Sequence, residues 1–162
     1  MAKNKAQEKT NEPTIENRRA RHDYFIESTL ECGMKLTGTE IKSVRAGQVS
    51  LAEGYVRATE TPLGLALHSV HIAEYPPAGA HRQHPPTRTR VLLAQAREIR
   101  KLAAQTREKG VTLVPLKIYF VRGKAKLLVG VGRGKGHADK RQDIAKRDAQ
   151  RDIDRALSRA RR

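Results

Sequence analysis

Histidines and one cysteine are the residues of this chain best suited to hold a metal ion. His68 and His71 are three residues apart, as are His81 and His84, and Cys32 is the single thiol. Residues three apart in a strand point to opposite faces, so the first pair is poorly placed to chelate. The second pair lies in a loop rich in Pro and Gly, but a closed zinc site needs four good ligands. We therefore expect no metal site and no cofactor, and we interpret the loop as mobile and partly basic.

A glycine-rich stretch, GVGRGKG from Gly130 to Gly136, has the composition of a phosphate-binding loop. The P-loop pattern requires Gly, four residues and then Gly-Lys-Ser/Thr. Here Gly136 follows Lys135, and Val129 occupies the place of the first glycine. We interpret the stretch as a hinge at which the last strand ends and a tail departs.

Acid–base chemistry has few candidates in this chain. His22 and Asp23 are adjacent and follow Arg21, but a solitary imidazole–carboxylate pair fits an ion pair or an RNA contact better than a general acid–base couple. The other acidic residues of the body are scattered, so a two-metal nuclease site has no evident ligands. We expect no catalytic residue and predict that the protein is not an enzyme.

The final thirty residues carry the clearest signal of a partner. Residues 133–162 contain eleven Lys or Arg, five Asp and only three large apolar residues, and the whole chain has a net charge of +16. This is too little apolar surface to bury a core, so we expect a basic tail that is disordered until it meets a polyanion. RNA is the best such partner. Membrane surfaces are the weaker alternative, because the chain has no Trp and two Phe.

Segments that would target or anchor the chain are not evident. The charged N-terminus lacks the apolar core of a signal peptide, and no stretch approaches the length of a bilayer-spanning helix. A single cysteine cannot form an internal disulfide, which fits a reducing compartment. We expect a cytoplasmic monomer with no membrane association.

Alternating apolar residues over 24–36 predict a half-buried strand, with Glu31 on its outer face and a bulge or bend at Gly33. Thr37 and Glu40 match a capping box, so a short helix should follow and end at Gly47. Further strands are expected over 54–59 and 63–72, a helix over 87–109 capped by Thr87, and two strands over 112–122 and 124–131. The last two form a hairpin whose exposed face carries four residues: Lys117, Tyr119, Lys124 and Lys126.

These elements predict a mainly β fold. Short strands, a bulged first strand and a helix between later strands are typical of a small closed antiparallel barrel of the OB type with flanking helices. We divide the chain into a disordered N-terminal segment (1–16), the barrel (17–132) and the tail (133–162). The basic hairpin face and the basic tail, and not the fold, favour RNA binding.

Several ordered motifs resemble the SsrA-binding protein (SmpB) family over about residues 17–162. They are the runs 17–27 and 36–47, Arg88-Thr89-Arg90 with Leu92-Leu93, the run GVTLVPLKIYF from Gly110 to Phe120, and Gly134-Lys135 with Asp139-Lys140-Arg141. The resemblance implies an OB-type barrel that binds the tRNA-like part of tmRNA. It also implies a tail that enters the decoding centre and mRNA channel of a stalled ribosome and folds there as a helix.

The resemblance also assigns residues. The family's RNA-contacting acidic, apolar and lysine residues fall on Glu31, Leu93 and Lys126, and His22 and Tyr24 lie in the matching opening segment. With the hairpin residues Lys117 and Lys124, they form the expected RNA-binding set. The expected ribosome-binding residues of the tail are Arg133, Gly134, Lys135, His137, Asp139, Lys140 and Arg141. Gly136 and Ala138 depart from the family pattern, which often has a second lysine and an aromatic residue or His there.

The leading hypothesis is therefore an RNA-binding adaptor that brings tmRNA to stalled ribosomes for trans-translation and peptide tagging. A general binder of structured RNA, or a ribosome-associated protein, would share the charge and the barrel and is the alternative. An RNA-processing enzyme is the third and weakest hypothesis.

Overall fold

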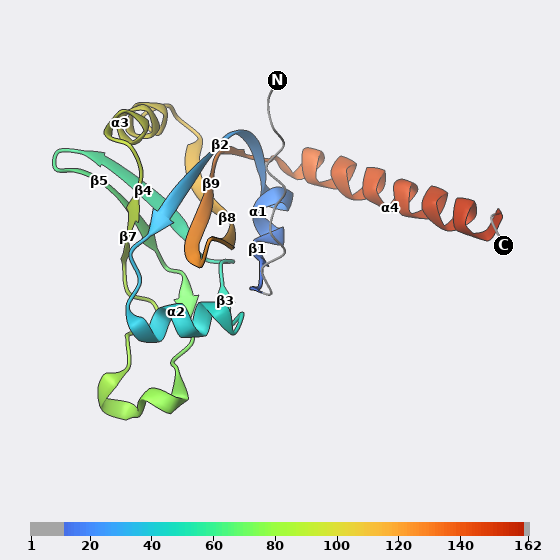
Figure 1. Cartoon of the computed structure of the whole chain (residues 1–162). Helices are drawn as coiled ribbons and strands as arrows, with labels where there is room; N and C mark the ends of the chain where they lie inside the picture. Colours follow the sequence, from blue (N-terminus) through green and yellow to red (C-terminus); the bar gives the residue numbers. More distant parts are fainter. Residues whose placement is uncertain (1–11, 161–162) are drawn as a thin grey trace, which may run out of the picture.

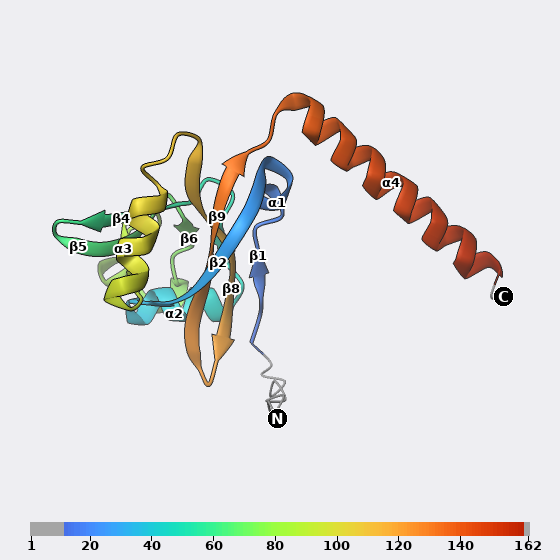
Figure 2. The same cartoon turned by 90° about the horizontal axis from the view of Figure 1, so that it is seen from above.

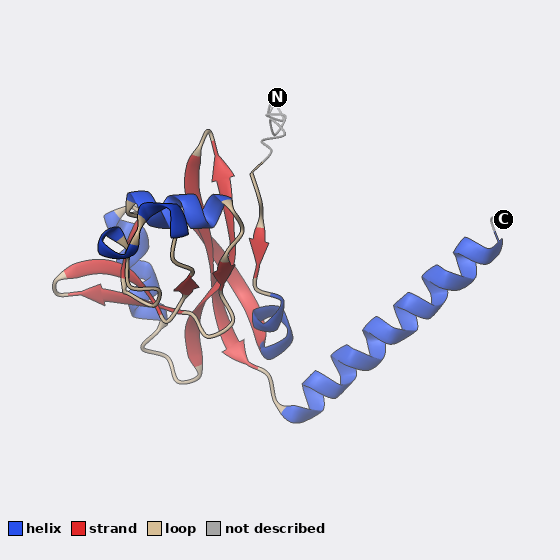
Figure 3. Ribbon diagram, turned by 90° about the horizontal axis from the view of Figure 1, so that it is seen from below, coloured by secondary structure: helices blue, strands red, loops and turns tan. Residues whose placement is uncertain are grey.

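The computed structural model describes residues 12–160, which form a mainly β body and a long C-terminal helix (Figures 1 and 3). The strands are β1 (Ile15–Glu16), β2 (Tyr24–Met34), β3 (Val49–Ser50), β4 (Tyr55–Glu60), β5 (Leu63–His68), β6 (His71–Ile72), β7 (Arg90–Leu93), β8 (Val111–Val121) and β9 (Lys124–Gly134). The α-helices are α1 (Arg18–Asp23), α2 (Gly38–Arg45), α3 (Ala96–Gln105) and α4 (His137–Ala160). Two short 3₁₀ turns, Pro76–Ala78 and Ala80–Arg82, lie in the loop before β7.

The main sheet is antiparallel, with the strand order β1-β8-β4-β5-β7-β2-β9. Strand β9, the last strand in this order, also pairs with β8, which is the second. The strands are not spaced evenly round one axis, so the closed barrel expected from the sequence is not established, whereas the mainly β class with helices is confirmed. Strands β2, β9 and β8 lie side by side, and α4 extends away from the body (Figure 2).

Two bulges change which alternate side chains of the long strands face the core. The register shifts between Ile26 and Ser28 in β2 and between Pro115 and Lys117 in β8. In β2, Cys32 after the bulge belongs to the main core, whereas Tyr24 and Ile26 before it pack on the outer face. In β8, Leu113 and Ile118 lie on either side of the bulge and both belong to the main core. That outer cluster consists of Ala20, Val114 and Leu116 with Tyr24, Ile26 and Leu128 packed against it. An extra residue in one strand reverses the side-chain parity, which is why α1 can cover the outer face.

Glycines of the GVGRGKG stretch make room for this outer cluster. A Cβ at Gly130 would lie 2.9 Å from Leu116 Cδ1, and one at Gly132 would lie 3.1 Å from the Tyr24 Cβ. Both glycines are inside β9, which runs on to Gly134. The hinge predicted for this stretch is therefore confined to its last residues, and Gly130 and Gly132 leave room for side chains of β2 and β8.

The helix predicted over 87–109 is wrong in its first half. Residues 90–93 form β7, in which Arg90 and Leu92 are buried while Val91 and Leu93 are exposed. The helix α3 begins at Ala96, where Gln95 and Glu98 form a capping box. The sequence pattern failed because Leu92 happens to continue the helical spacing of the apolar residues of α3.

Other boundaries also differ from the prediction. The bulge lies at Ile26–Ser28 and not at Gly33, which instead pairs with both Leu93 and Lys126 where β2 passes between two neighbours. The strand predicted over 63–72 is split into β5 and β6 by Ser69, whose φ is 55°. The capping box of α2 is confirmed, because Glu40 accepts a hydrogen bond from the Thr37 N–H at 2.8 Å.

Both predicted disordered segments contain structure. Residues 15–16 form β1, which pairs with β8 from Ile15 opposite Ile118, so the expectation of disorder is wrong there; residues 1–11 lie outside the described part. The tail forms α4 from His137, with Arg133 and Gly134 still in β9. The tail is therefore described as a helix, and disorder of the tail is not shown.

Candidate nucleic-acid interface

A hydrogen-bonded trio lies on the outer face of three neighbouring strands. Glu31 of β2 accepts a hydrogen bond from the Tyr119 hydroxyl of β8, and its other carboxylate oxygen is 3.3 Å from Lys126 Nζ of β9. The register explains the meeting, because Lys126 lies opposite Tyr119 on one side and Gly33 on the other. The predicted outward position of Glu31 agrees with its 46% exposed side chain.

The electrostatics of the trio keep Glu31 ionised. The hydrogen bond from Tyr119 is the largest effect and lowers the pKa of the Glu31 carboxyl; burial opposes it, and Lys126 lowers the pKa further. Burial and the neighbouring Glu31 raise the pKa of the Tyr119 hydroxyl well above its usual range, so Tyr119 stays protonated and remains a donor. The carboxylate is thus a fixed acceptor that a nucleotide base or ribose hydroxyl could share.

The same face includes Leu93 and the basic hairpin. Leu93 of β7 pairs with Gly33, so it lies in one cross-strand row with Lys126 and Tyr119, and its side chain is 56% exposed. The Lys117 Nζ lies 5.0 Å from the centre of the Tyr119 ring, and Lys124 is exposed at the hairpin end. We call Glu31, Leu93, Lys117, Tyr119, Lys124 and Lys126 the strand face. It combines an acceptor, an apolar side chain, an aromatic ring and three cations.

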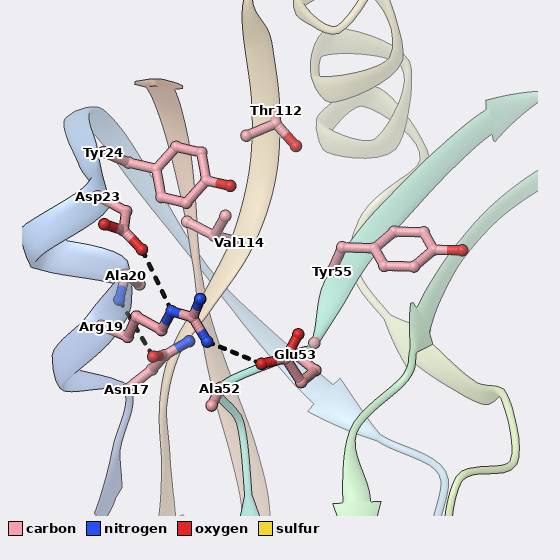
Figure 4. Close-up of a pocket in the computed structure, with 11 residues that line it drawn as sticks. Asn17, Arg19, Ala20, Asp23, Tyr24, Ala52, Glu53, Tyr55, Thr112 and Val114 are labelled. Atoms are coloured by element: carbon pink, nitrogen blue, oxygen red, sulfur yellow. Dashed lines mark hydrogen bonds and ion pairs between the residues drawn. The ribbon is translucent and has the colours of Figure 1, made fainter. Parts of the chain in front are cut away.

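His22 and Tyr24 are not part of the strand face. His22 is in α1 and Tyr24 begins β2, seven residues from Glu31, so Tyr24 is about 20 Å from Glu31 along the strand. The His22 Nδ1 is 2.9 Å from Asp23 Oδ1, and Tyr24 lines an open pocket of about 280 Å³ between α1 and β4. In Figure 4 the Arg19 side chain reaches towards Asp23 and Glu53 across this pocket, at 3.4 Å and 2.8 Å. The predicted RNA-binding set is therefore split between two places on the body.

The predicted tail residues are engaged to different degrees. Arg133 in β9 forms ion pairs with Glu27 and Glu108 at 2.6 Å and 2.7 Å. Gly134 ends β9, and His137 begins α4. Asp139 accepts a hydrogen bond from the Gly136 N–H, and Arg141 is exposed.

Lys135 and Lys140, like Arg133, contact the body through their side chains. The Lys135 ammonium is 3.0 Å from the Arg21 carbonyl oxygen and 2.5 Å from Asp143 Oδ2. The Lys140 Nζ is 2.9 Å from Asp23 Oδ1. The hydrogen bond from Lys140, followed by that from His22, lowers the pKa of Asp23 to about 2.

A buried ionic network explains the Arg88-Thr89-Arg90 motif. Arg90 and Glu40 are fully buried, with Arg90 Nε 2.8 Å from Glu40 Oε1, while Arg88 donates to both Glu40 oxygens. Arg90 also donates to the carbonyls of Val70 and Pro86, so α2, β7 and the loop before β7 are joined. Sequence reasoning identified Glu40 only as a capping residue; its charge and the two arginines were the available signal.

His68 and His84 each have their own structural partners. His68 stacks on Tyr55, with ring centres 5.0 Å apart, and buried His84 contacts Thr39 Oγ1 and the Ile72 carbonyl. Within residues 12–160, no group of three His, Cys, Asp or Glu residues is placed to hold a metal ion. Burial raises the pKa of the Cys32 thiol to about 12. No described helix has both the length and the apolar composition needed to cross a bilayer.

Comparison with known proteins places this geometry in a family. Residues 14–159 match the family described as SmpB protein. The chain belongs to the SmpB family. It is 54% identical over 142 residues to the SsrA-binding protein of Roseiflexus sp. (strain RS-1), which covers 88% of this chain and 89% of that protein. It is 52% identical over 163 residues to the SsrA-binding protein of Thermobifida fusca (strain YX), over 99% and 100% of the two chains.

A solved SmpB structure has the same fold. A chain from "tmRNA-SmpB: a journey to the center of the bacterial ribosome" aligns with a TM-score of 0.64 and 47% sequence identity, over 77% of this chain and 86% of that one. The family resemblance expected from the sequence motifs is therefore confirmed.

Proposed function

We propose that this SmpB-family chain is an RNA-binding adaptor that binds tmRNA and delivers it to stalled ribosomes for trans-translation and peptide tagging. The proposal rests on the family's curated members, which are SsrA-binding proteins, and on the similar chain from a tmRNA–SmpB ribosome structure. The observation that carries it to particular residues is the strand face, where Glu31, Lys126 and Tyr119 form one exposed network.

The strand face has the chemistry to recognise a folded RNA. Lys117, Lys124 and Lys126 supply cations for phosphates, which position an RNA without reading its sequence. Glu31 supplies an acceptor for base edges or ribose hydroxyls, and Leu93 supplies an exposed apolar contact for an unstacked base. The body that holds these residues is proposed to be an OB-like barrel, because β9 pairs with both β2 and β8.

The tail is proposed to act on the ribosome and not on tmRNA. Arg141, Lys146 and Arg147 lie on an exposed helix far richer in charge than in apolar side chains. Such a helix presents mostly charge to its surroundings and fits a polyanionic channel such as that of ribosomal RNA. We propose the decoding centre and mRNA channel as its site and the cytoplasm as its compartment. The chemistry of tagging would belong to the ribosome and tmRNA, so the adaptor has no catalytic residue.

Two variants separate the roles of body and tail. Truncation after Gly136 should leave the Kd for tmRNA unchanged and abolish tagging on ribosomes stalled in a purified translation system. Lys126→Glu should weaken tmRNA binding by about tenfold or more, since it reverses a charge beside Glu31. Lys101→Glu, an equal charge change on an exposed face of α3, is the matched control.

Competition with bulk tRNA tests specificity. A dedicated adaptor should keep labelled tmRNA in a large excess of tRNA, whereas a general RNA-binding protein should release it. Loss of tmRNA binding on truncation would contradict the proposed division of labour. Salt dependence alone does not discriminate, because either protein should show a log–log slope of about 0.7 to 0.9 per neutralised phosphate.

A further inference from the structure

The first turns of α4 are attached to the body by side chains, unlike the rest of that helix. Lys135 precedes α4 and has a side chain only 6% exposed. Lys140 and Asp143 are three residues apart, so they share a face of the helix. Beyond Asp143, the side-chain ion pairs and hydrogen bonds described for α4 join residues of α4 to one another, as in Arg151–Asp148 and Arg155–Asp152.

Lys135 is held by four groups. Its backbone N–H donates to the Asp23 carbonyl at 2.8 Å, and its ammonium contacts the Arg21 carbonyl and the Asp143 carboxylate. The ammonium also lies 4.8 Å from the centre of the Phe25 ring. The Arg21 carbonyl is in the last turn of α1, where a helix end attracts cations. A nearly buried lysine is stable only with such compensation, so its geometry is well defined.

Asp23 provides a second, independent attachment. It ends α1, and its carboxylate contacts Lys140 at 2.9 Å as well as His22 and Arg19. The two attachments, Asp23–Lys140 and Lys135–Asp143, lie at different points along the start of the tail. Two separated contacts fix the orientation of α4 relative to the body, whereas α4 could rotate about a single contact.

We propose that Asp23, Lys135, Lys140 and Asp143 form an anchor that sets the direction in which the tail leaves the body. This inference rests on the proposed function and deepens it: Lys135 and Lys140 act as positioning residues of the adaptor, and the ribosome-contacting cations begin at Arg141. A body bound to tmRNA would then present its tail already oriented towards its site on the ribosome.

The orientation can be measured in the free protein. Spin labels at Ala104→Cys in α3 and Ala156→Cys in α4 report the distance between body and tail by pulsed electron resonance. Both positions are exposed, whereas Cys32 is fully buried and should not be labelled. We expect a narrow distance distribution in the parent and a broad one in Asp23→Asn/Asp143→Asn. The matched control is Asp148→Asn, which removes the same charge from α4 without touching the body.

A charge exchange separates positioning from a general loss of structure. Asp23→Lys should broaden the distribution, and Asp23→Lys/Lys140→Asp should narrow it again. A broad distribution in the parent, or one unchanged in Asp23→Asn/Asp143→Asn, would overturn the anchor.

Function gives the second readout. In tagging assays at limiting protein, Asp23→Asn/Asp143→Asn should lower the rate about fivefold to tenfold, as the oriented fraction falls, with the Kd for tmRNA unchanged. An unaltered tagging rate despite a broadened distribution would overturn the positioning role. A parent that binds tmRNA but never supports tagging would instead refute the proposed function, and the distance measurements would still decide whether the anchor exists.

Discussion

The Tyr119 hydroxyl donates a hydrogen bond to the Glu31 carboxylate across the intervening strand β9, from which Lys126 approaches the same carboxylate. Eighty-eight residues separate the two along the chain, so their meeting depends on the order of β2, β9 and β8. The acidic residue assigned to RNA contact is therefore held in place by a tyrosine that was not in the predicted binding set.

Removing this tyrosine hydroxyl should weaken RNA binding. Tyr119→Phe leaves the ring under Lys117 but frees the Glu31 carboxylate, and we expect the Kd for tmRNA to rise about fivefold, equivalent to about 1 kcal/mol for one lost hydrogen bond. Filter binding or fluorescence anisotropy at fixed salt measures this. Tyr55→Phe, on exposed β4, should leave the Kd unchanged; equal effects of both variants would rule out a special role for the Tyr119–Glu31 contact.

The buried Glu40 should be among the most sensitive positions for stability. Glu40→Gln leaves Arg90 buried without its counter-ion, and we expect the free energy of unfolding to fall by about 3 to 5 kcal/mol in urea titrations. Glu98→Gln is the matched control, since Glu98 occupies the same capping position in α3 but its partner Gln95 is exposed. Its cost should be below about 1 kcal/mol. Similar losses of unfolding free energy for the two variants would indicate that Glu40 stabilises the protein only as a capping residue.

The same glutamate should dominate the stability of the body in acid. Burial opposes ionisation, but hydrogen bonds from Arg88, the Thr37 N–H and Arg90 prevail and lower the pKa of Glu40 from 4.5 to about 2. Because the folded pKa is depressed, the stabilisation is complete above about pH 4.5 and is lost as pH falls towards 2. A shift of this size corresponds to roughly 3 kcal/mol. The urea midpoint of the parent should fall steeply over this window, and that of Glu40→Gln should fall less; parallel curves would contradict the assignment.

The close packing of β2 and β8 side chains over Gly130 should depend on its missing side chain. Gly130→Ala places a methyl group 2.9 Å from Leu116 Cδ1 and 3.2 Å from Ile26 Cγ2, and we expect a loss of about 1 to 3 kcal/mol in unfolding free energy. Gly134→Ala adds the same atom where no atom lies within 4 Å, so it should have little effect on stability. A second change, Leu116→Ala, should cost less in the Gly130→Ala background than alone. Strict additivity would show that the two side chains do not compete for space.

Local patterns in the sequence were sufficient to predict secondary structure in segments whose apolar residues follow a single periodicity. The alternation in residues 24–36 predicted β2 and the outward Glu31, and the capping pair Thr37 and Glu40 predicted α2. The alternation in 124–131 predicted Lys124 and Lys126 on one face of the hairpin, and the intervening Ala125 and Leu127 of β9 are buried. These signals survive without tertiary information because side-chain direction in a strand and the capping of a helix depend on neighbouring residues alone.

The periodicity failed where strand and helix spacings coincide or where a bulge reverses parity. Leu92 fits the apolar spacing of α3, yet it lies in β7 and faces the core. The bulge at Ile26–Ser28 moves Tyr24 to the outer face although its even number matches buried Cys32. A bulge depends on tertiary packing, here that of α1 on the sheet, so the spacing of apolar residues within β2 does not reveal it.

Charge and motifs in the sequence determined the kind of partner and the family, because net charge and ordered motifs can be recognised without knowledge of the fold. Which residues act together was decided only by the tertiary structure. Strand order brought Tyr119 to Glu31, kept His22 and Tyr24 apart from them, and placed Asp23 beside Lys140. Such contacts join residues about ninety or more positions apart, and their proximity comes from the pairing of strands that burial of the common core selects.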